Sequence, residues 1–85
     1  MSRTTQQLLM PRLGESVTEG TVDKWLKRQG DVIQIDDPIV EIVTDKLQTE
    51  VTSPFAGILA RVLVAEGSTV AVGTVLAEIE TVEGP

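Results

Sequence analysis

Short runs of Val, Ile and Leu recur along the chain, and within many of them apolar residues alternate with polar ones. Gly, Pro, Asp or Ser interrupts the runs every few residues, as is typical of β-strands separated by turns. No window keeps apolar residues at the i, i+3 and i+4 spacing for the length of an ordinary helix. We therefore expect an all-β fold of about eight short strands. Their expected bounds are Leu8–Met10, Val22–Leu26, Val32–Ile35, Pro38–Val43, Leu47–Val51, Ile58–Val64, Thr69–Val72 and Val75–Ile79.

The chain also contains an internal repeat. With a shift of 37 residues, the segment 20–46 aligns without a gap with the segment 57–83, and six of the 27 pairs are identical. The matched residues Gly30 and Gly67 lie in short polar segments and are suited to tight turns. Two such halves around one core suggest a pseudo-twofold flattened β-barrel or sandwich. The identical pairs are Gly20/Gly57, Leu26/Leu63, Gly30/Gly67, Glu41/Glu78, Ile42/Ile79 and Thr44/Thr81.

The two halves differ at residues 44–47, where the first half continues through Thr-Asp-Lys-Leu into a further strand. This predicts a hairpin with Lys46 at its outermost point and the amine in water. Asp-Lys is not among the pairs favoured in two-residue hairpin turns, which suggests selection for something other than turning. The expected register gives the hairpin one apolar face and one mostly polar face. It pairs Thr44 with Leu47, Ile42 with Thr49 and Val40 with Val51 on the apolar face, and Val43 with Gln48, Glu41 with Glu50 and Ile39 with Thr52 on the other.

Composition removes many kinds of chemistry from this chain of 85 residues. Cys and His are absent, which excludes a disulfide, thiol or imidazole catalysis, and metal sites that need these ligands. Seven Lys and Arg against thirteen Asp and Glu give a net charge of −6, which disfavours binding to nucleic acid or to an anionic membrane. No apolar run is long enough to span a membrane. Asp36 and Asp37 are adjacent carboxylates without further converging oxygens, so they predict a solvated turn and no metal site.

Lys46 is the residue of most chemical interest. Its neighbours Asp45, Glu41 and Glu50 favour the charged form of the amine, which argues against catalysis by the amine itself. We therefore expect no catalytic residue in this chain. From the residues alone, Lys46 is either an ordinary solvated lysine or a site of covalent modification.

Several segments together resemble the lipoyl domains at the N-terminus of dihydrolipoyl acyltransferases in 2-oxo acid dehydrogenase complexes, which belong to the biotinyl/lipoyl-attachment family. The similarity covers residues 8–81, so we expect a single domain over residues 1–81 and the start of an interdomain linker at residues 82–85. The resemblance implies a fold of two four-stranded antiparallel sheets. The segments that carry it are Met10-Pro-Arg-Leu-Gly-Glu-Ser-Val-Thr-Glu-Gly-Thr21, Trp25-Leu-Lys, Gly30-Asp, Asp37-Pro, Val40-Glu-Ile-Val-Thr-Asp-Lys46 and Ser53-Pro-Phe-Ala-Gly57.

The same resemblance implies a cofactor, lipoic acid, joined by an amide bond to Lys46. Thr44, Asp45 and Leu47 flank that lysine and are expected to contribute to its recognition. The loop that contains Gly14, Glu15, Ser16 and Val17 is expected to lie near the hairpin and to contribute to partner recognition. An ordinary polar loop is the alternative for this segment.

The implied function is that of a swinging-arm carrier without turnover of its own. A thiamine-diphosphate 2-oxo acid decarboxylase reductively acylates the lipoyl group, CoA accepts the acyl group at the acyltransferase core domain, and dihydrolipoyl dehydrogenase restores the disulfide. Lipoate ligase or lipoyl synthase would supply the modification. We expect a branched-chain 2-oxo acid or 2-oxoglutarate complex, in the cytoplasm of a bacterium or in the mitochondrial matrix.

Two alternatives belong to other classes. Biotin carrier domains share this fold, but they carry Met on both sides of the modified lysine, and the segment Asp45-Lys46-Leu47 has neither. An unmodified β-barrel interaction module is the second alternative.

Overall fold

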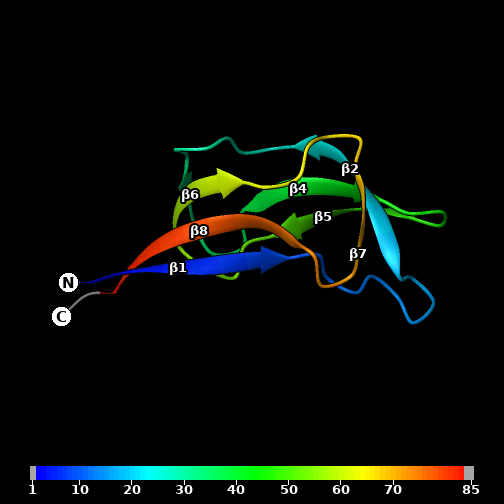
Figure 1. Cartoon of the computed structure of the whole chain (residues 1–85), viewed down its shortest axis with the longest axis horizontal. Helices are drawn as coiled ribbons and strands as arrows, with labels where there is room; N and C mark the ends of the chain where they lie inside the picture. Colours follow the sequence, from blue (N-terminus) through cyan, green and yellow to red (C-terminus); the bar gives the residue numbers. More distant parts are fainter. Residues whose placement is uncertain (1, 84–85) are drawn as a thin grey trace.

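The computed structural model describes residues 2–83, which form eight β-strands and no helix (Figure 1). The all-β prediction is therefore confirmed. Of the expected linker at residues 82–85, Val82 and Glu83 belong to the last strand, and residues 84–85 lie outside the described part of the chain. The strands are β1 (Ser2–Leu9), β2 (Glu19–Trp25), β3 (Val32–Ile33), β4 (Pro38–Val43), β5 (Gln48–Thr52), β6 (Gly57–Val62), β7 (Thr69–Ala71) and β8 (Val75–Glu83).

The strands form two four-stranded antiparallel sheets, in the orders β1-β8-β6-β3 and β5-β4-β2-β7. The 37-residue shift relates β2, β3 and β4 to β6, β7 and β8, and β1 stands beside β8 as β5 stands beside β4. The two sheets then have the same order, and each takes its short edge strand, β3 or β7, from the other repeat. The sandwich of two pseudo-equivalent sheets predicted from the repeat is confirmed.

The repeat extends to irregularities of the backbone. The β2–β4 register shifts between Val22 and Lys24, and the β6–β8 register shifts at the equivalent point, between Leu59 and Arg61. Gly30 and Gly67 both have positive φ, at 95° and 89°, as the turn prediction required.

A second pair of equivalent turns also needs a left-handed backbone. Asp36 has a φ of 71°, and the equivalent residue Gly73 has a φ of 92°. Each residue donates its N–H to the first residue after a neighbouring edge strand: Asp36 to the carbonyl of Ser53, after β5, at 2.7 Å, and Gly73 to the carbonyl of Met10, after β1, at 2.9 Å. Asp tolerates this conformation better than most non-glycine residues. One half of the molecule therefore meets the requirement with Asp and the other with Gly.

The core lies between the two sheets, where alternate residues of the strands point inward. Trp25 packs against its margin, half-buried, and its indole Nε1–H donates to the Val64 carbonyl at 2.8 Å. This bond ties the end of β2 to the segment that follows β6. The buried apolar side chains are Leu8, Met10, Val22, Ile33, Ile39, Val40, Ile42, Val51, Leu59, Leu76, Ala77 and Ile79.

The expected strand bounds differ most from the observed ones at β1, and the expected β3 was also too long. The first strand spans Ser2–Leu9 and not Leu8–Met10, because the polar residues 3–7 pair in unbroken register with β8 through their backbones. β3 is limited to Val32–Ile33, since the chain turns at Asp36 and leaves Ile35 61% exposed. β8 ends at Glu83 and not at Ile79, and β2 begins at Glu19 and not at Val22, whereas the remaining strands begin and end within two residues of their expected bounds.

The matched residues Gly20 and Gly57 mark places of close approach. A Cβ atom on Gly57 would overlap the backbone carbonyl oxygen of Glu80 in β8. A Cβ atom on Gly20 would lie 2.7 Å from both Ile42 Cγ2 and Met10 Cε. Glycine is therefore needed at both places for space and not for positive φ.

Candidate functional site

The hairpin of β4 and β5 presents the candidate residue Lys46 at its tip. Four pairs of the predicted register are confirmed, namely Val43/Gln48, Ile42/Thr49, Glu41/Glu50 and Val40/Val51. The predicted Ile39/Thr52 pair is wrong, because a register shift between Pro38 and Val40 pairs Thr52 with Pro38. This irregularity lets the consecutive residues Ile39 and Val40 both reach the core.

Thr44 closes the turn with its side chain. Its N–H donates to the Leu47 carbonyl at 2.8 Å, and its Oγ1 accepts the N–H groups of Lys46 at 3.3 Å and Leu47 at 3.2 Å. Asp45 and Lys46 both have negative φ, since Asp36 is the only non-glycine residue with positive φ among the described residues. The primed turns, which need positive φ at the first central residue, are therefore not used here. The Thr44 hydroxyl explains how Asp-Lys can occupy this turn.

Lys46 itself is open to solvent, as are Asp45 and Leu47 on either side. Within residues 2–83, no carboxylate lies close enough to the Lys46 amine to form an ion pair. The tip projects from one end of the molecule, whereas β1 begins and β8 ends at the opposite end (Figure 1). The longest dimension of the fold is 44 Å, so the tip and the chain ends are widely separated.

The loop between β1 and β2 lies beside the hairpin tip, and an open groove of about 730 Å³ separates them. We call it the tip groove. All eight residues singled out in the sequence line it: Gly14, Glu15, Ser16 and Val17 from the loop, and Thr44, Asp45, Lys46 and Leu47 from the hairpin. Leu13, at the start of the same predicted loop, lines it as well. The sequence did not point to the remaining lining residues, which are Thr18, Glu19, Gly20, Thr21, Val43 and Thr69.

Local hydrogen bonds shape the loop wall of the groove. The Val17 N–H donates to the Gly14 carbonyl at 3.1 Å, which closes a turn, and Arg12 Nη2 donates to the Glu15 carbonyl at 3.4 Å. The Thr18 carbonyl accepts the Val72 N–H at 3.0 Å. The loop is therefore fixed at its C-terminal side to the segment after β7.

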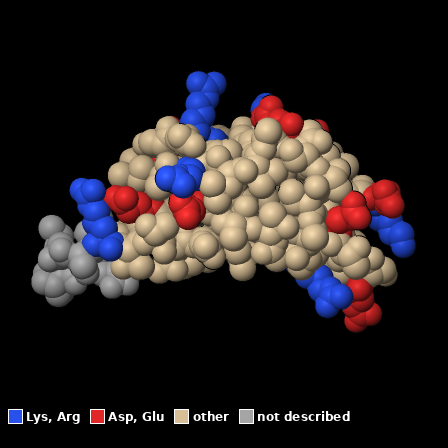
Figure 2. Space-filling view, in the orientation of Figure 1, with Lys and Arg blue, Asp and Glu red and all other residues tan. Residues whose placement is uncertain are grey.

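The tip groove is acidic apart from Lys46. Glu15, Glu19 and Asp45 line it, and Lys46 is the one cation among its lining residues. Figure 2 shows acidic and basic side chains next to one another at several places on one face, whose middle is uncharged. Ion pairs such as Arg3–Glu80, at 3.2 Å, account for part of this arrangement. The groove thus gathers negative charge around a single lysine.

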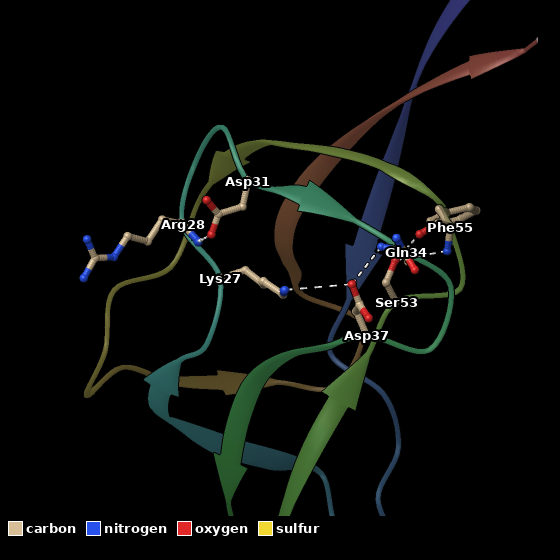
Figure 3. A network of polar contacts seen from close by, with 7 residues as sticks. All are labelled: Lys27, Arg28, Asp31, Gln34, Asp37, Ser53 and Phe55. Carbon is tan, nitrogen blue, oxygen red and sulfur yellow. Dashed lines mark hydrogen bonds and ion pairs between the residues drawn. The ribbon is translucent and has the colours of Figure 1, made fainter.

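The turn at Asp36 and Asp37 belongs to a structural network (Figure 3). Asp37 Oδ2 accepts the Gln34 N–H at 2.9 Å and lies 3.9 Å from Lys27 Nζ. Ser53 is buried, and its hydroxyl donates to the Phe55 carbonyl at 2.6 Å.

In the part of the chain that is described, no cluster of three His, Cys, Asp or Glu residues could hold a metal ion, and no helix could cross a membrane.

Comparisons with known proteins agree with this geometry. A biotin/lipoyl family model, described as "Biotin-requiring enzyme", matches residues 6–79. The chain is 57% identical over 72 residues, 85% of its length, to the dihydrolipoyllysine-residue acetyltransferase component of pyruvate dehydrogenase complex from Mycobacterium bovis. It is 49% identical over 76 residues, 89% of its length, to the lipoamide acyltransferase component of branched-chain alpha-keto acid dehydrogenase complex from Bacillus subtilis. It spans only 13% and 18% of these relatives.

The fold is also found in a solved structure. The solution structure of the lipoyl domain of the 2-oxoglutarate dehydrogenase complex from Azotobacter vinelandii superimposes with a TM-score of 0.71 at 35% sequence identity. The superposition covers 93% of this chain and 98% of that one. Two four-stranded sheets and a hairpin with an exposed lysine thus occur within a fold already known to serve as a lipoyl domain.

Proposed function

The chain belongs to the family of biotin- and lipoyl-attachment domains, and on this premise we propose that it is a lipoyl carrier domain with lipoic acid amide-linked to Lys46. The observation that carries the proposal is the position of Lys46, exposed at the tip of a hairpin whose turn is fixed by Thr44. When attached, the lipoyl group supplies a reducible disulfide on a long tether that can take up an acyl group and pass it on. The chain itself supplies presentation, not catalysis.

The residues around Lys46 suit such an attachment. An exposed amine without an ion-pair partner among residues 2–83 is accessible to a modifying enzyme and costs no salt bridge when it becomes an amide. Thr44 holds the backbone of residues 44–47 in one conformation, so a modifying enzyme meets a preformed tip. We propose that lipoate ligase or lipoyl synthase acts here and that Asp45 and Leu47, both exposed, are contacted in that step.

A loaded tip needs partner enzymes whose active sites admit a projecting tether. We propose the thiamine-diphosphate 2-oxo acid decarboxylase, the acyltransferase core domain and dihydrolipoyl dehydrogenase. Amide formation takes the formal net charge from −6 to −7 and leaves the tip groove without a cation among its lining residues. The loop residues Gly14–Val17, on the opposite wall of the groove, would be contacted together with the tip.

The similar proteins belong to more kinds of 2-oxo acid dehydrogenase complex than the two expected from the sequence. Their names include pyruvate, branched-chain and 2-oxoglutarate dehydrogenase complexes, at 57%, 49% and 49% identity. We therefore propose a 2-oxo acid dehydrogenase complex as the setting and include pyruvate beside the two substrates favoured from the sequence.

The proposal is tested by modification of the purified chain. Incubation with lipoate ligase, lipoate and ATP should add one lipoyl group, and peptide mapping should locate it on Lys46. Lys46→Ala should remove the gain in mass and leave the fold intact, since Lys46 is exposed. Lys27→Ala is the matched control and should be modified like the parent chain.

Three results would contradict the proposal. A lipoyl group on Lys46→Ala would show that the attachment site is wrong. Modification by biotin ligase, but not by lipoate ligase, would assign the chain to the biotin branch of the same family. An unmodified chain under conditions that modify a known lipoyl domain would leave an interaction module with an ordinary lysine.

A further inference from the structure

The tip groove has apolar residues on both walls, which the exposure of Lys46 at a hairpin tip does not by itself require. Three residues with large apolar side chains line it on the two walls: Leu13 and Val17 are half-buried, and Leu47 is 37% exposed. Leu13 and Val17 come from the loop wall, and Leu47 comes from the hairpin wall. Apolar surface therefore faces the groove from both sides, next to the base of Lys46.

We propose, on the basis of the proposed lipoyl function, that this groove is a seat for the apolar part of the chain's own arm on Lys46. In this proposal the arm exchanges between a seated position, in contact with Val17 and Leu47, and a free position in solvent. The occupant is thus a group attached to this same chain.

The attachment point supports this choice of occupant. Lys46 is itself a lining residue, so the arm begins inside the groove and needs no encounter with a second molecule. A group tethered this closely has an effective concentration of roughly millimolar or more toward a neighbouring site. Even a weak contact is then occupied for a substantial part of the time.

The chemistry of the walls also suits an uncharged arm. The carboxylates of Glu15, Glu19 and Asp45 would repel an anionic ligand, but an oxidised lipoyl group in amide linkage has no charge. Its methylene chain gains by leaving water for apolar side chains, and its polarizable sulfurs pack well against them. The charged amine of Lys46 favours a side chain that points into solvent. Amide formation removes this charge, so the methylene groups of Lys46 are then free to lie against the groove.

The walls are firm enough to form a defined seat. Leu13 packs against the hydrophobic core, which fixes one side. On the other side, Thr44 fixes the turn that holds Leu47. The lining also includes Thr21 and Thr69, whose hydroxyls are joined by a hydrogen bond of 2.8 Å.

The test uses the 85-residue chain carrying lipoate on Lys46, labelled with ¹⁵N and ¹³C. Nuclear Overhauser effects are expected between arm protons and the methyl groups of Val17 and Leu47. Amide shifts at Leu13 and Val17 should differ between the unmodified and lipoylated chains. Val17→Ser should abolish the contacts to the loop, whereas Ile35→Ser, at an exposed apolar residue outside the groove, should keep them.

A chemical measurement provides a second readout. If the seat is occupied about half the time, reduction of the disulfide by dithiothreitol should be about twofold slower in the parent chain than in Val17→Ser. The Ile35→Ser chain should react like the parent. Intrinsic fluorescence of Trp25 checks that each variant is folded.

The outcomes separate this inference from the proposed function. Lipoylation of Lys46 with shift changes confined to residues 45–47, no contacts to Val17, and equal reduction rates in all three chains would overturn the seat but leave the carrier function in place. Failure of Lys46 to accept lipoate would overturn both.

Discussion

The hydroxyl of Thr44 fixes the conformation of the hairpin tip. Its Oγ1 accepts two backbone N–H groups across the turn and lies 3.3 Å from the Leu47 carbonyl, to which it can donate. Neither central residue of the turn adopts positive φ, so the side chain replaces backbone geometry that hairpins usually obtain from Asn-Gly. A residue two positions before the lysine therefore controls how the lysine is presented.

Replacement of Thr44 tests this control. Thr44→Val keeps the shape but removes the acceptor for the Lys46 and Leu47 N–H groups, and we expect the free energy of unfolding to fall by about 1 kcal/mol. Because the tip loses its fixed conformation, lipoylation by the ligase should also become slower. Urea denaturation followed by Trp25 fluorescence, together with the rate of mass gain, measures both effects.

Thr44→Ser is the matched control, since it retains the hydroxyl. It should modify at close to the parental rate. Equal modification rates for the Val and Ser variants would show that the hydrogen bonds to Oγ1 have no role in presentation.

At the scale of residues, the sequence predicted that Lys46 and its neighbours form a hairpin turn, but it did not predict the hydrogen bonds that fix this turn. The position of Lys46 at the hairpin tip was predictable, because the register of a hairpin follows from the alternation of apolar and polar residues. The role of Thr44 and the positive φ of Asp36 were not predictable, because each depends on a turn conformation that several sequences can adopt. The alignment of Asp36 with Gly73 was the available signal for the positive φ of Asp36, because glycine is the residue that most readily adopts this conformation.

At the scale of elements, the pattern predicted the strands well where side chains alternate without interruption. It failed where a strand contains an extra residue, as at Ile39, because an irregularity shifts the register and places two neighbouring residues in the core. It also failed at β1, whose polar N-terminal part is held by backbone pairing with β8. Pairing of this kind leaves no apolar periodicity in the sequence.

The two matched glycines allow a test within the repeat. Gly57→Ala would place a methyl group against backbone atoms of β8, which cannot move without disturbing the sheet, and we expect a loss of roughly 3 kcal/mol in unfolding free energy. Gly20→Ala would meet the ends of the Met10 and Ile42 side chains, which can shift, so the loss should be clearly smaller. Urea denaturation of both variants measures the difference.

The order of the two losses is the critical result. Equal losses, or a greater loss for Gly20→Ala, would contradict the explanation based on backbone approach.

At the scale of the molecule, the repeat was the most informative signal in the sequence. It predicted two equivalent sheets around one core, and the equivalence extends to turns and register shifts. It did not predict the exchange of β3 and β7 between the sheets, because an alignment relates the two halves without saying which strands pair. The exchange means that each sheet needs both halves of the chain.

The antiparallel pairing of β1 with β8 has a mechanical consequence. Ser2 pairs with Glu83, so tension applied at these two residues acts on one end of the ladder and opens its hydrogen bonds one after another. Tension between Lys46 and Glu83 acts along the 44 Å axis and loads many bonds together. In optical tweezers, we expect rupture at a markedly lower force in the first geometry than in the second, and equal forces would contradict this. The domain would then resist a high force when it is pulled between Lys46 and Glu83 and a low force when it is pulled between Ser2 and Glu83.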